Sequence, residues 1–314
     1  MTRWNTSHIP DQTGRSAVVT GANSGIGYVT ARELARRGAR VVLACRSTER
    51  GAAALDRLRS EVPTAEAEFR RLDLADLSSV RDFAAGLDDF DGDRLGLLVN
   101  NAGVMALPRR TTADGFEMQF GTNHLGHFAL TGLLLPRLLA TPGARVVTVS
   151  SMLHALANVD LGDLNSERPY GRWTAYARSK SANLLFTHEL ARRLAAAGSG
   201  VVVAAAHPGY AATNLQTAGV RMEGRRSAER AIDLGTRLIG QPADGGALGT
   251  LCAATAPHMR PDSFIGPRSG LRGAPARSFR APWTANGRTA EALWTASEQL
   301  TGVRHDFAVP AAAR

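Results

Sequence analysis

The stretch Thr20-Gly21-Ala22-Asn23-Ser24-Gly25-Ile26-Gly27 lies between a short apolar run, Ala17–Val19, and an amphipathic segment. Glycines between a strand and a helix let the backbone approach a ligand, and the free N–H groups of the helix N-terminus attract a diphosphate. Three residues and then one separate these glycines, which differs from the general G-x-G-x-x-G pattern. The stretch predicts a nucleotide site. A tight strand-to-helix turn without a ligand is the alternative.

The rest of the chain continues this alternation of short apolar runs and amphipathic segments. The pattern predicts strands at 17–19, 40–45, 68–72, 95–99, 145–149 and 201–206, and helices at 25–37, 50–60, 77–87, 116–139, 174–197, 243–256 and 288–300. Strands joined by helical crossovers form a parallel sheet. We therefore expect an α/β fold: one doubly wound Rossmann-type domain with a mostly parallel seven-stranded sheet and helices on both faces.

Composition limits the function classes that remain open. The 314 residues, 44% of them hydrophobic, are enough for one large domain over 1–314. The formal charge of +9 does not predict a nucleic-acid partner, because the arginines are scattered among acids. Cys45 and Cys252 come without a secretory segment, so we expect a cytoplasmic protein without a disulfide framework. No apolar run is long enough to predict a membrane span.

The chain contains 37 basic residues, and only one of them, Lys180, is a lysine. Lysine differs from arginine in being a compact charge that can lose its proton, so this position needs a property that arginine lacks. Tyr176 precedes Lys180 by four residues, which places both on one face of a helix. A charge about 4 Å away at an effective dielectric of about 20 supplies roughly 4 kcal/mol, enough to lower a phenol pKa toward neutrality. Tyr176 is therefore a candidate acid/base group.

Cofactor choice is expected to depend on the ends of the second and third strands. Arg46 ends the second strand, where an acidic residue would bind the ribose of NAD and an arginine suits the 2′-phosphate of NADP. Asp73 follows the third strand, where it could contact the adenine edge or cap the next helix. The sequence thus favours NADP (NADPH), with NAD less favoured.

Several motifs, in this order, resemble those of the short-chain dehydrogenase/reductase family. They are Thr20–Gly27, Asp73-Leu74, Asn100-Asn101-Ala102-Gly103, Thr122-Asn123-His124-Leu125-Gly126-His127-Phe128, Val149-Ser150-Ser151, Tyr176–Lys180 and His207-Pro208-Gly209. The resemblance covers about 14–302. The Asn123–Phe128 segment, the strand end at Cys45-Arg46 and the closing Leu293–Gly302 segment are most similar to the retinol-dehydrogenase-like branch.

The resemblance implies a role for each catalytic candidate. Tyr176 would be the general acid in carbonyl reduction and the base in alcohol oxidation, and Lys180 would lower its pKa and bind the nicotinamide ribose. Ser151 would donate to the substrate oxygen, with its neighbour Ser150 as an alternative assignment. Asn123 would position a water on a proton path to Lys180.

The same resemblance implies a larger set of cofactor-binding residues along the carboxyl ends of the strands. These are Gly21, Asn23, Ser24, Gly25, Ile26, Gly27, Arg46, Asp73, Leu74, Asn100, Ala102, Gly103, Tyr176, Lys180, Pro208, Gly209 and Thr213. Asn100 would act by hydrogen bonds, and Ala102 and Gly103 by allowing close approach.

Substrate contacts are expected from the insertion between Ser151 and Tyr176 and from 210–282, the latter as substrate lid and C-terminal extension. The apolar residues Met152, Leu153, Leu156 and Trp173 predict a lipophilic carbonyl or alcohol. We expect NADP-dependent oxidoreduction, with reduction of an activated C=C bond or a non-catalytic dinucleotide-binding regulator as alternatives. His124 and His127 have metal-ligand spacing, but no third ligand is near and we predict no metal site. Family members are often dimers or tetramers, so a homo-oligomer is possible.

Overall fold

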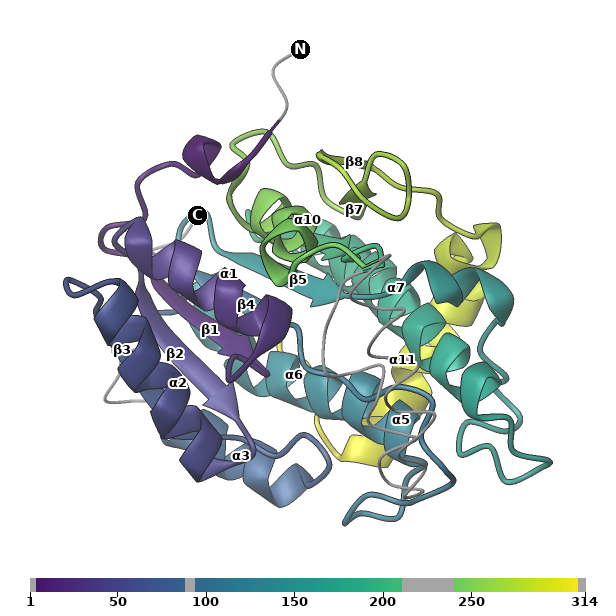
Figure 1. Ribbon diagram of the computed structural model, residues 1–314. Helices are drawn as coiled ribbons and strands as arrows, with labels where there is room; N and C mark the ends of the chain where they lie inside the picture. Colours follow the sequence, from purple (N-terminus) through teal and green to yellow (C-terminus); the bar gives the residue numbers. More distant parts are fainter. Residues whose placement is uncertain (1–3, 88–93, 211–239, 310–314) are drawn as a thin grey trace.

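The computed structural model describes residues 4–87, 94–210 and 240–309 (Figure 1). In these ranges one eight-stranded sheet has the order β3-β2-β1-β4-β5-β6-β7-β8. Every neighbouring pair is parallel except β7 and β8, which are antiparallel. The doubly wound Rossmann-type fold expected from the sequence is confirmed.

The elements follow the predicted alternation closely. The strands are β1 (Ser16–Thr20), β2 (Arg40–Cys45), β3 (Ala67–Arg71), β4 (Leu97–Asn100), β5 (Arg145–Val149), β6 (Val202–Ala206), β7 (Ser263–Pro267) and β8 (Pro275–Arg277). The longer helices are α1 (Gly25–Arg36), α2 (Thr48–Glu61), α3 (Leu77–Ala85), α6 (Gly126–Leu139), α7 (Arg172–Ala196), α10 (Ala243–Thr255) and α11 (Gly287–Thr301). Short helical turns are η1 (Thr6–His8), α5 (Met118–Phe120), η2 (Gly121–Leu125), η3 (Met152–Leu156) and η4 (Pro282–Ala285).

The helices cover both faces of the sheet (Figure 1). On one face α1, α2 and α10 bury Leu34, Leu58 and Leu251 against the strands. On the other face α3, α6 and α7 bury a second core that includes Phe83 and Phe128. Because both faces are covered, the central strands are apolar throughout and show no alternation with polar residues.

Eight strands were found where seven were expected. The segment 257–282, part of the expected lid and C-terminal extension in which we predicted no strand, contains both β7 and β8. β8 has only three residues and pairs with the sheet edge through Ile265 and Pro267. A short edge strand with few apolar residues carries little periodic signal, so composition could not reveal it.

The strand order reverses between β1 and β4, and this topology creates a crevice at the carboxyl ends of the strands. The ends of β1, β4, β5 and β6 are followed by residues 21, 101, 150 and 207. The motifs at Thr20–Gly27, Asn100–Gly103, Val149–Ser151 and His207–Gly209 therefore lie along one edge of the sheet. This edge is where a ligand is expected to bind.

Candidate active site

The turn from β1 to α1 is shaped for close approach of a ligand. Gly21 and Gly25 have left-handed φ values of 67° and 55°, which favour glycine. A Cβ on Gly27 would lie 2.4 Å from the Nδ2 atom of Asn101 and 2.5 Å from the carbonyl oxygen of Gly21. Ser24 is the exposed N-cap of α1, and its side chain makes no capping hydrogen bond there. The first N–H groups of α1 are thus left for a diphosphate.

The loop after β4 is bonded to this turn. The Thr20 hydroxyl accepts hydrogen bonds from the backbone N–H groups of Asn101 and Ala102, both at 2.9 Å. Asn101 also donates its Nδ2 to the Thr20 carbonyl at 2.7 Å. The side chain of Asn100 is fully buried and donates to Thr131 of α6. The side-chain amide of Asn101, and not that of Asn100, therefore lies at the nucleotide turn. Asn101 was not among the predicted cofactor-binding residues.

Arg46 and Asp73 face each other across the ends of β2 and β3. The Arg46 Nε lies 4.0 Å from the Asp73 Oδ2, and the arginine side chain is 63% exposed. The other Asp73 oxygen accepts from the N–H of Ala75 at 3.0 Å. Leu74 is buried in the core, so its side chain does not face the crevice. Apart from this long contact with Asp73, the Arg46 guanidinium is largely exposed to solvent.

Tyr176 and Lys180 lie on the same face of α7, as their spacing predicted. The Lys180 Nζ is 5.8 Å from the centre of the Tyr176 ring, and both side chains are buried. The Nζ donates to the Val149 carbonyl at 3.1 Å. Ser151 lies within hydrogen-bonding reach of the Tyr176 phenol, so three functional groups meet beside the ends of β5 and α7.

We expected a lowered pKa for the Tyr176 phenol, but its surroundings in the protein raise it. Burial raises the pKa of Tyr176 to about 12, against a smaller lowering by Ser151. Burial also lowers the pKa of Lys180 to about 8. An ammonium about 4 Å away at an effective dielectric of about 20 would lower the phenol pKa, but desolvation opposes both charges in a buried site. Tyr176 therefore stays protonated at neutral pH, and Lys180 titrates near pH 8.

The two adjacent serines have different surroundings. The Ser150 hydroxyl is buried and donates to the Lys180 carbonyl at 2.7 Å, which fixes the middle of α7. Ser151 is partly exposed, and its hydroxyl accepts from the Leu153 N–H at 3.2 Å. Of the two serines, Ser151 is the one within hydrogen-bonding reach of the Tyr176 phenol. These contacts favour Ser151 over Ser150 as the serine that meets a substrate.

Asn123 lies in η2, a π-helical turn that interrupts the predicted helix 116–139. Its amide accepts from the Val104 N–H at 2.7 Å and donates to the Val104 carbonyl and to the Ser179 hydroxyl, both at 2.9 Å. Insertions of this kind in helices are frequent at functional sites. Asn123 thereby fixes the loop after β4 against α7, close to Lys180.

Glycine at position 103 keeps that loop close to Asn123 and Lys180, two of the catalytic candidates. A Cβ there would lie 3.0 Å from the Asn123 Oδ1 and 3.4 Å from the Lys180 Nζ. Pro208 and Gly209 follow β6 and are partly exposed. Gly209 has φ 67°, and a Cβ on it would lie 2.3 Å from the Leu271 carbonyl oxygen. Thr213 and the rest of 211–239 lie outside the described residues.

His124 and His127 point to different partners. His124 Nε2 lies 2.8 Å from the Ser297 hydroxyl, whereas His127 Nε2 lies 2.9 Å from the Thr20 hydroxyl. Burial lowers their pKa values to about 3 and about 4. Within the three described ranges no group of three or more His, Cys, Asp or Glu side chains could hold a metal ion.

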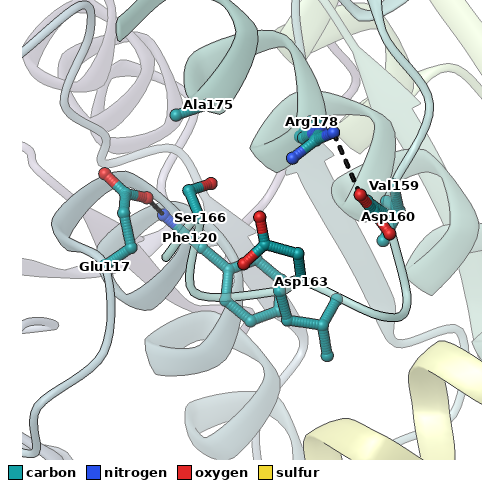
Figure 2. A pocket seen from close by; sticks show the side chains of 9 residues that line it. Glu117, Phe120, Val159, Asp160, Asp163, Ser166, Ala175 and Arg178 are labelled. Atoms are coloured by element: carbon teal, nitrogen blue, oxygen red, sulfur yellow. Dashed lines mark hydrogen bonds and ion pairs between the residues drawn. The ribbon is translucent and has the colours of Figure 1, made fainter. Parts of the chain in front are cut away.

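A small pocket lies under the insertion between Ser151 and Tyr176 (Figure 2). Asp160 and Asp163 line it, and the Arg178 Nη2 of α7 lies 3.3 Å from the Asp160 Oδ2. Glu117, on its opposite wall, accepts from the Phe120 N–H at 2.7 Å. None of the catalytic candidates lines this pocket. Its ion pair instead anchors the insertion to α7.

Comparison with known proteins decides the family. The sequence model of short chain dehydrogenases matches residues 15–224, more than half of the chain. The chain is a short-chain dehydrogenase. It belongs to the retinol-dehydrogenase-like branch, since it is 43% identical to Retinol dehydrogenase 12 of Homo sapiens over 292 residues, 93% of this chain and 87% of that protein. The matches to Retinol dehydrogenase 13 and Retinol dehydrogenase 11 of Homo sapiens span 60% and 63% of those proteins.

Solved structures agree with the fold of this short-chain dehydrogenase. An uncharacterised protein from Mycobacterium Paratuberculosis is 48% identical with a TM-score of 0.80, over 97% of this chain and 100% of that one. A short chain dehydrogenase from Burkholderia cenocepacia J2315 in complex with NADP is 25% identical with a TM-score of 0.62, over 82% of this chain and 97% of that one. The family establishes an oxidoreductase of alcohol or carbonyl groups. In the described parts of the chain no helix is both long and apolar enough to cross a membrane.

Proposed function

We propose that this short-chain dehydrogenase is an NADP-dependent oxidoreductase that interconverts a carbonyl and an alcohol on a lipophilic small molecule. The observation that carries the proposal is the meeting of Tyr176, Ser151 and Lys180 at the carboxyl edge of the sheet. Asn123 completes the set implied by the family resemblance, and it is fixed beside them.

The nucleotide turn fits a dinucleotide. A backbone with left-handed Gly21 and Gly25, no room for a Cβ at Gly27 and an uncapped α1 offers N–H groups to a diphosphate. Asn23, Ile26 and Asn101 would flank it, and Arg46 would bind the 2′-phosphate. The bound nicotinamide supplies or accepts the hydride.

The protein's own groups handle the proton. In reduction, the Tyr176 phenol gives its proton to the carbonyl oxygen as the carbon receives the hydride, and the products are the alcohol and the oxidised cofactor. The raised pKa of Tyr176, caused by burial, keeps this acid protonated. Ser151 donates a hydrogen bond to the same oxygen, where negative charge develops. The Lys180 ammonium stabilises the phenolate left behind.

Exposed apolar side chains near Ser151 support a lipophilic substrate. Leu156 is 69% exposed in η3, the turn that starts after Ser151, and Trp173 is 52% exposed at the start of α7. Phe279 is 60% exposed, and its ring centre lies 6.4 Å from that of His154 in the same turn, η3. Leu271 is also exposed, and its carbonyl accepts from the Tyr210 N–H at 3.0 Å. Apolar side chains around a few polar groups are typical of small-molecule sites.

Titration with NADPH and NADH, followed by turnover of aliphatic and aromatic aldehydes and ketones of increasing length, tests the proposal. We expect tighter binding of NADPH and a kcat/KM that rises with apolar chain length. Product analysis separates carbonyl reduction from reduction of an activated C=C bond. Binding of NADPH without turnover of any carbonyl would favour a non-catalytic regulator. The cytoplasmic location, the lid and the homo-oligomer stay predictions.

Replacing Arg46 tests the cofactor assignment. We expect Arg46→Ala to weaken NADPH binding by roughly tenfold to a hundredfold, because a charge-assisted hydrogen bond contributes about 1.5–3 kcal/mol. NADH binding should change little. The matched control is Arg40→Ala, at the other end of β2, which should alter neither. Equal losses for NADPH and NADH in Arg46→Ala would contradict a 2′-phosphate contact.

The pH dependence of carbonyl reduction should reflect Lys180. The pKa of Lys180 is lowered to about 8. We therefore expect kcat/KM to fall as pH rises through about 8, because a neutral Lys180 no longer stabilises the phenolate. Activity that survives in Lys180→Arg should lack this fall, because a guanidinium stays charged. A wild-type profile that is flat up to pH 10 would be incompatible with this role.

A further inference from the structure

Two buried histidines connect one short segment, 278–281, to both catalytic loops. His154 lies in η3, three residues after Ser151, and is 0% exposed. His207 follows β6, directly before Pro208-Gly209, and is 1% exposed. The ring of Phe264 on β7 packs against both, with ring centres 5.4 Å from His154 and 5.1 Å from His207. We call His154 and His207 the histidine clasp.

The contacts of His154 define its tautomer. The backbone N–H of Ala281 donates to His154 Nε2 at 3.0 Å, so this nitrogen carries no proton. The proton of the neutral ring is therefore on Nδ1, which donates to the Ser151 carbonyl at 2.6 Å. Burial lowers the pKa of His154, consistent with a neutral ring. The ring thus bridges the catalytic serine and residue 281.

His207 has the opposite arrangement. The Gly209 N–H donates to His207 Nδ1 at 3.1 Å, so the proton is on Nε2, which lies 2.6 Å from the Ser278 hydroxyl. Ser278 then donates to the sulfur of Met152, the neighbour of Ser151, at 3.5 Å. A Cβ on Gly266 would lie 1.8 Å from His207 Nε2, so only glycine leaves room for this ring.

The segment between the two contacts is itself held firmly. Arg280 donates to the Leu184 carbonyl of α7 at 2.9 Å and to the Asp262 carboxylate at 2.6 Å. Residues 278, 280 and 281 are thus each bonded to other elements. A fixed segment of this kind can hold the loops that it touches in a defined position.

We propose that His154 is a positioning residue for Ser151, and that the histidine clasp fixes segment 278–281 as the support that holds the Ser151 loop and the Pro208-Gly209 turn in register. The inference rests on the proposed function, because Ser151 matters only if it meets the substrate oxygen. The sequence around His154 and His207 did not indicate this support, because their partners Ser278 and Ala281 are more than 70 residues away in the chain.

The tautomers can be measured without any substrate. In a protein with ¹⁵N-labelled histidine we expect His154 to be protonated at Nδ1 only and His207 at Nε2 only, each signal being assigned by its loss in the matching Phe variant. The same tautomer at both rings, or a protonated cation at neutral pH, would overturn the clasp.

Two variants separate the two bonds of His154. Asparagine places an N–H donor near the position of Nδ1, and glutamine places an acceptor near the position of Nε2. We therefore expect His154→Asn to keep most of the wild-type kcat and His154→Gln to lose about tenfold or more, because a small displacement of a catalytic group is costly. Both variants lose one buried hydrogen bond and should lose similar stability. The KM for NADPH should not change, because His154 is not at the nucleotide turn.

The outcomes distinguish this inference from the proposed function. If the wild-type protein reduces no carbonyl, the proposed function fails and the positioning role fails with it, while the tautomers still decide the clasp. If the wild type is active and His154→Gln matches His154→Asn in kcat, only the positioning role is overturned. A kcat that simply follows the stability of both variants would indicate a structural histidine.

Discussion

Tyr176→Phe should reduce kcat/KM for carbonyl reduction by a factor on the order of 10²–10⁴, the usual contribution of a positioned proton donor. The substitution removes one oxygen from a buried side chain and leaves the ring in place. Ser151, which lies within hydrogen-bonding reach of this phenol, keeps its contact with the Leu153 N–H. NADPH binding and the folded structure should therefore be retained. Steady-state kinetics and a cofactor titration on the same preparation measure both.

Tyr170→Phe is the matched control. The Tyr170 hydroxyl lies 3.0 Å from the Leu107 carbonyl oxygen and 3.1 Å from the Glu117 carboxylate, and it accepts from Gln119 at 2.9 Å. Burial raises the pKa of this phenol as well. Its removal should cost stability, because a buried carboxylate loses a partner, but it should leave the chemical step largely unchanged. Equal loss of turnover in Tyr170→Phe and Tyr176→Phe would show that neither phenol is the acid.

The fold was predictable because its elements are long and periodic. The predicted helix at 174–197 was found at Arg172–Ala196, and that at 288–300 at Gly287–Thr301. The errors arose where the signal is short or concerns distant partners. β7 escaped notice because its pairing with β6, more than 50 residues earlier in the chain, defines it, and β8 because it is defined by its pairing with β7. The π turn at Gly121–Leu125 adds no periodic signal of its own.

The site was predictable as a list of motifs, but less so as chemistry. Spacing placed Tyr176 and Lys180 on one helix face, which the structure shows. It could not show that Ser150 bonds to the α7 backbone, or that Asn101 and not Asn100 reaches the nucleotide turn. Desolvation was also invisible, because the burial of Lys180 comes from β5, α7 and the β4 loop together. The sign of the phenol pKa shift was therefore wrong.

Lys180→Met should abolish measurable turnover and at the same time stabilise the fold. The wild-type ammonium is buried, no carboxylate in the described part of the chain pairs with it, and burial lowers its pKa from 10.5 to about 8. At or below pH 7 this shift corresponds to a cost of about 3 kcal/mol in the free energy of unfolding. Methionine has a similar length and no charge to desolvate. The Val149 carbonyl keeps a donor, since Asn183 Nδ2 lies 3.1 Å from it.

The sign of the pH dependence makes this prediction specific. Between pH 8 and 10.5 the unfolded wild-type chain binds more protons at Lys180 than the folded protein, so the wild type gains stability as pH rises through this window. The advantage of Lys180→Met, measured by urea unfolding without cofactor, should therefore be largest at pH 7 and shrink toward pH 10.5. Taking the difference between the two proteins cancels every other titrating group. A variant that is less stable than wild type at pH 7, or a difference that is constant across the window, would show that burial does not disfavour the charged form of Lys180. The Lys180 account of the pH profile would then fail too, because both depend on the same buried ammonium.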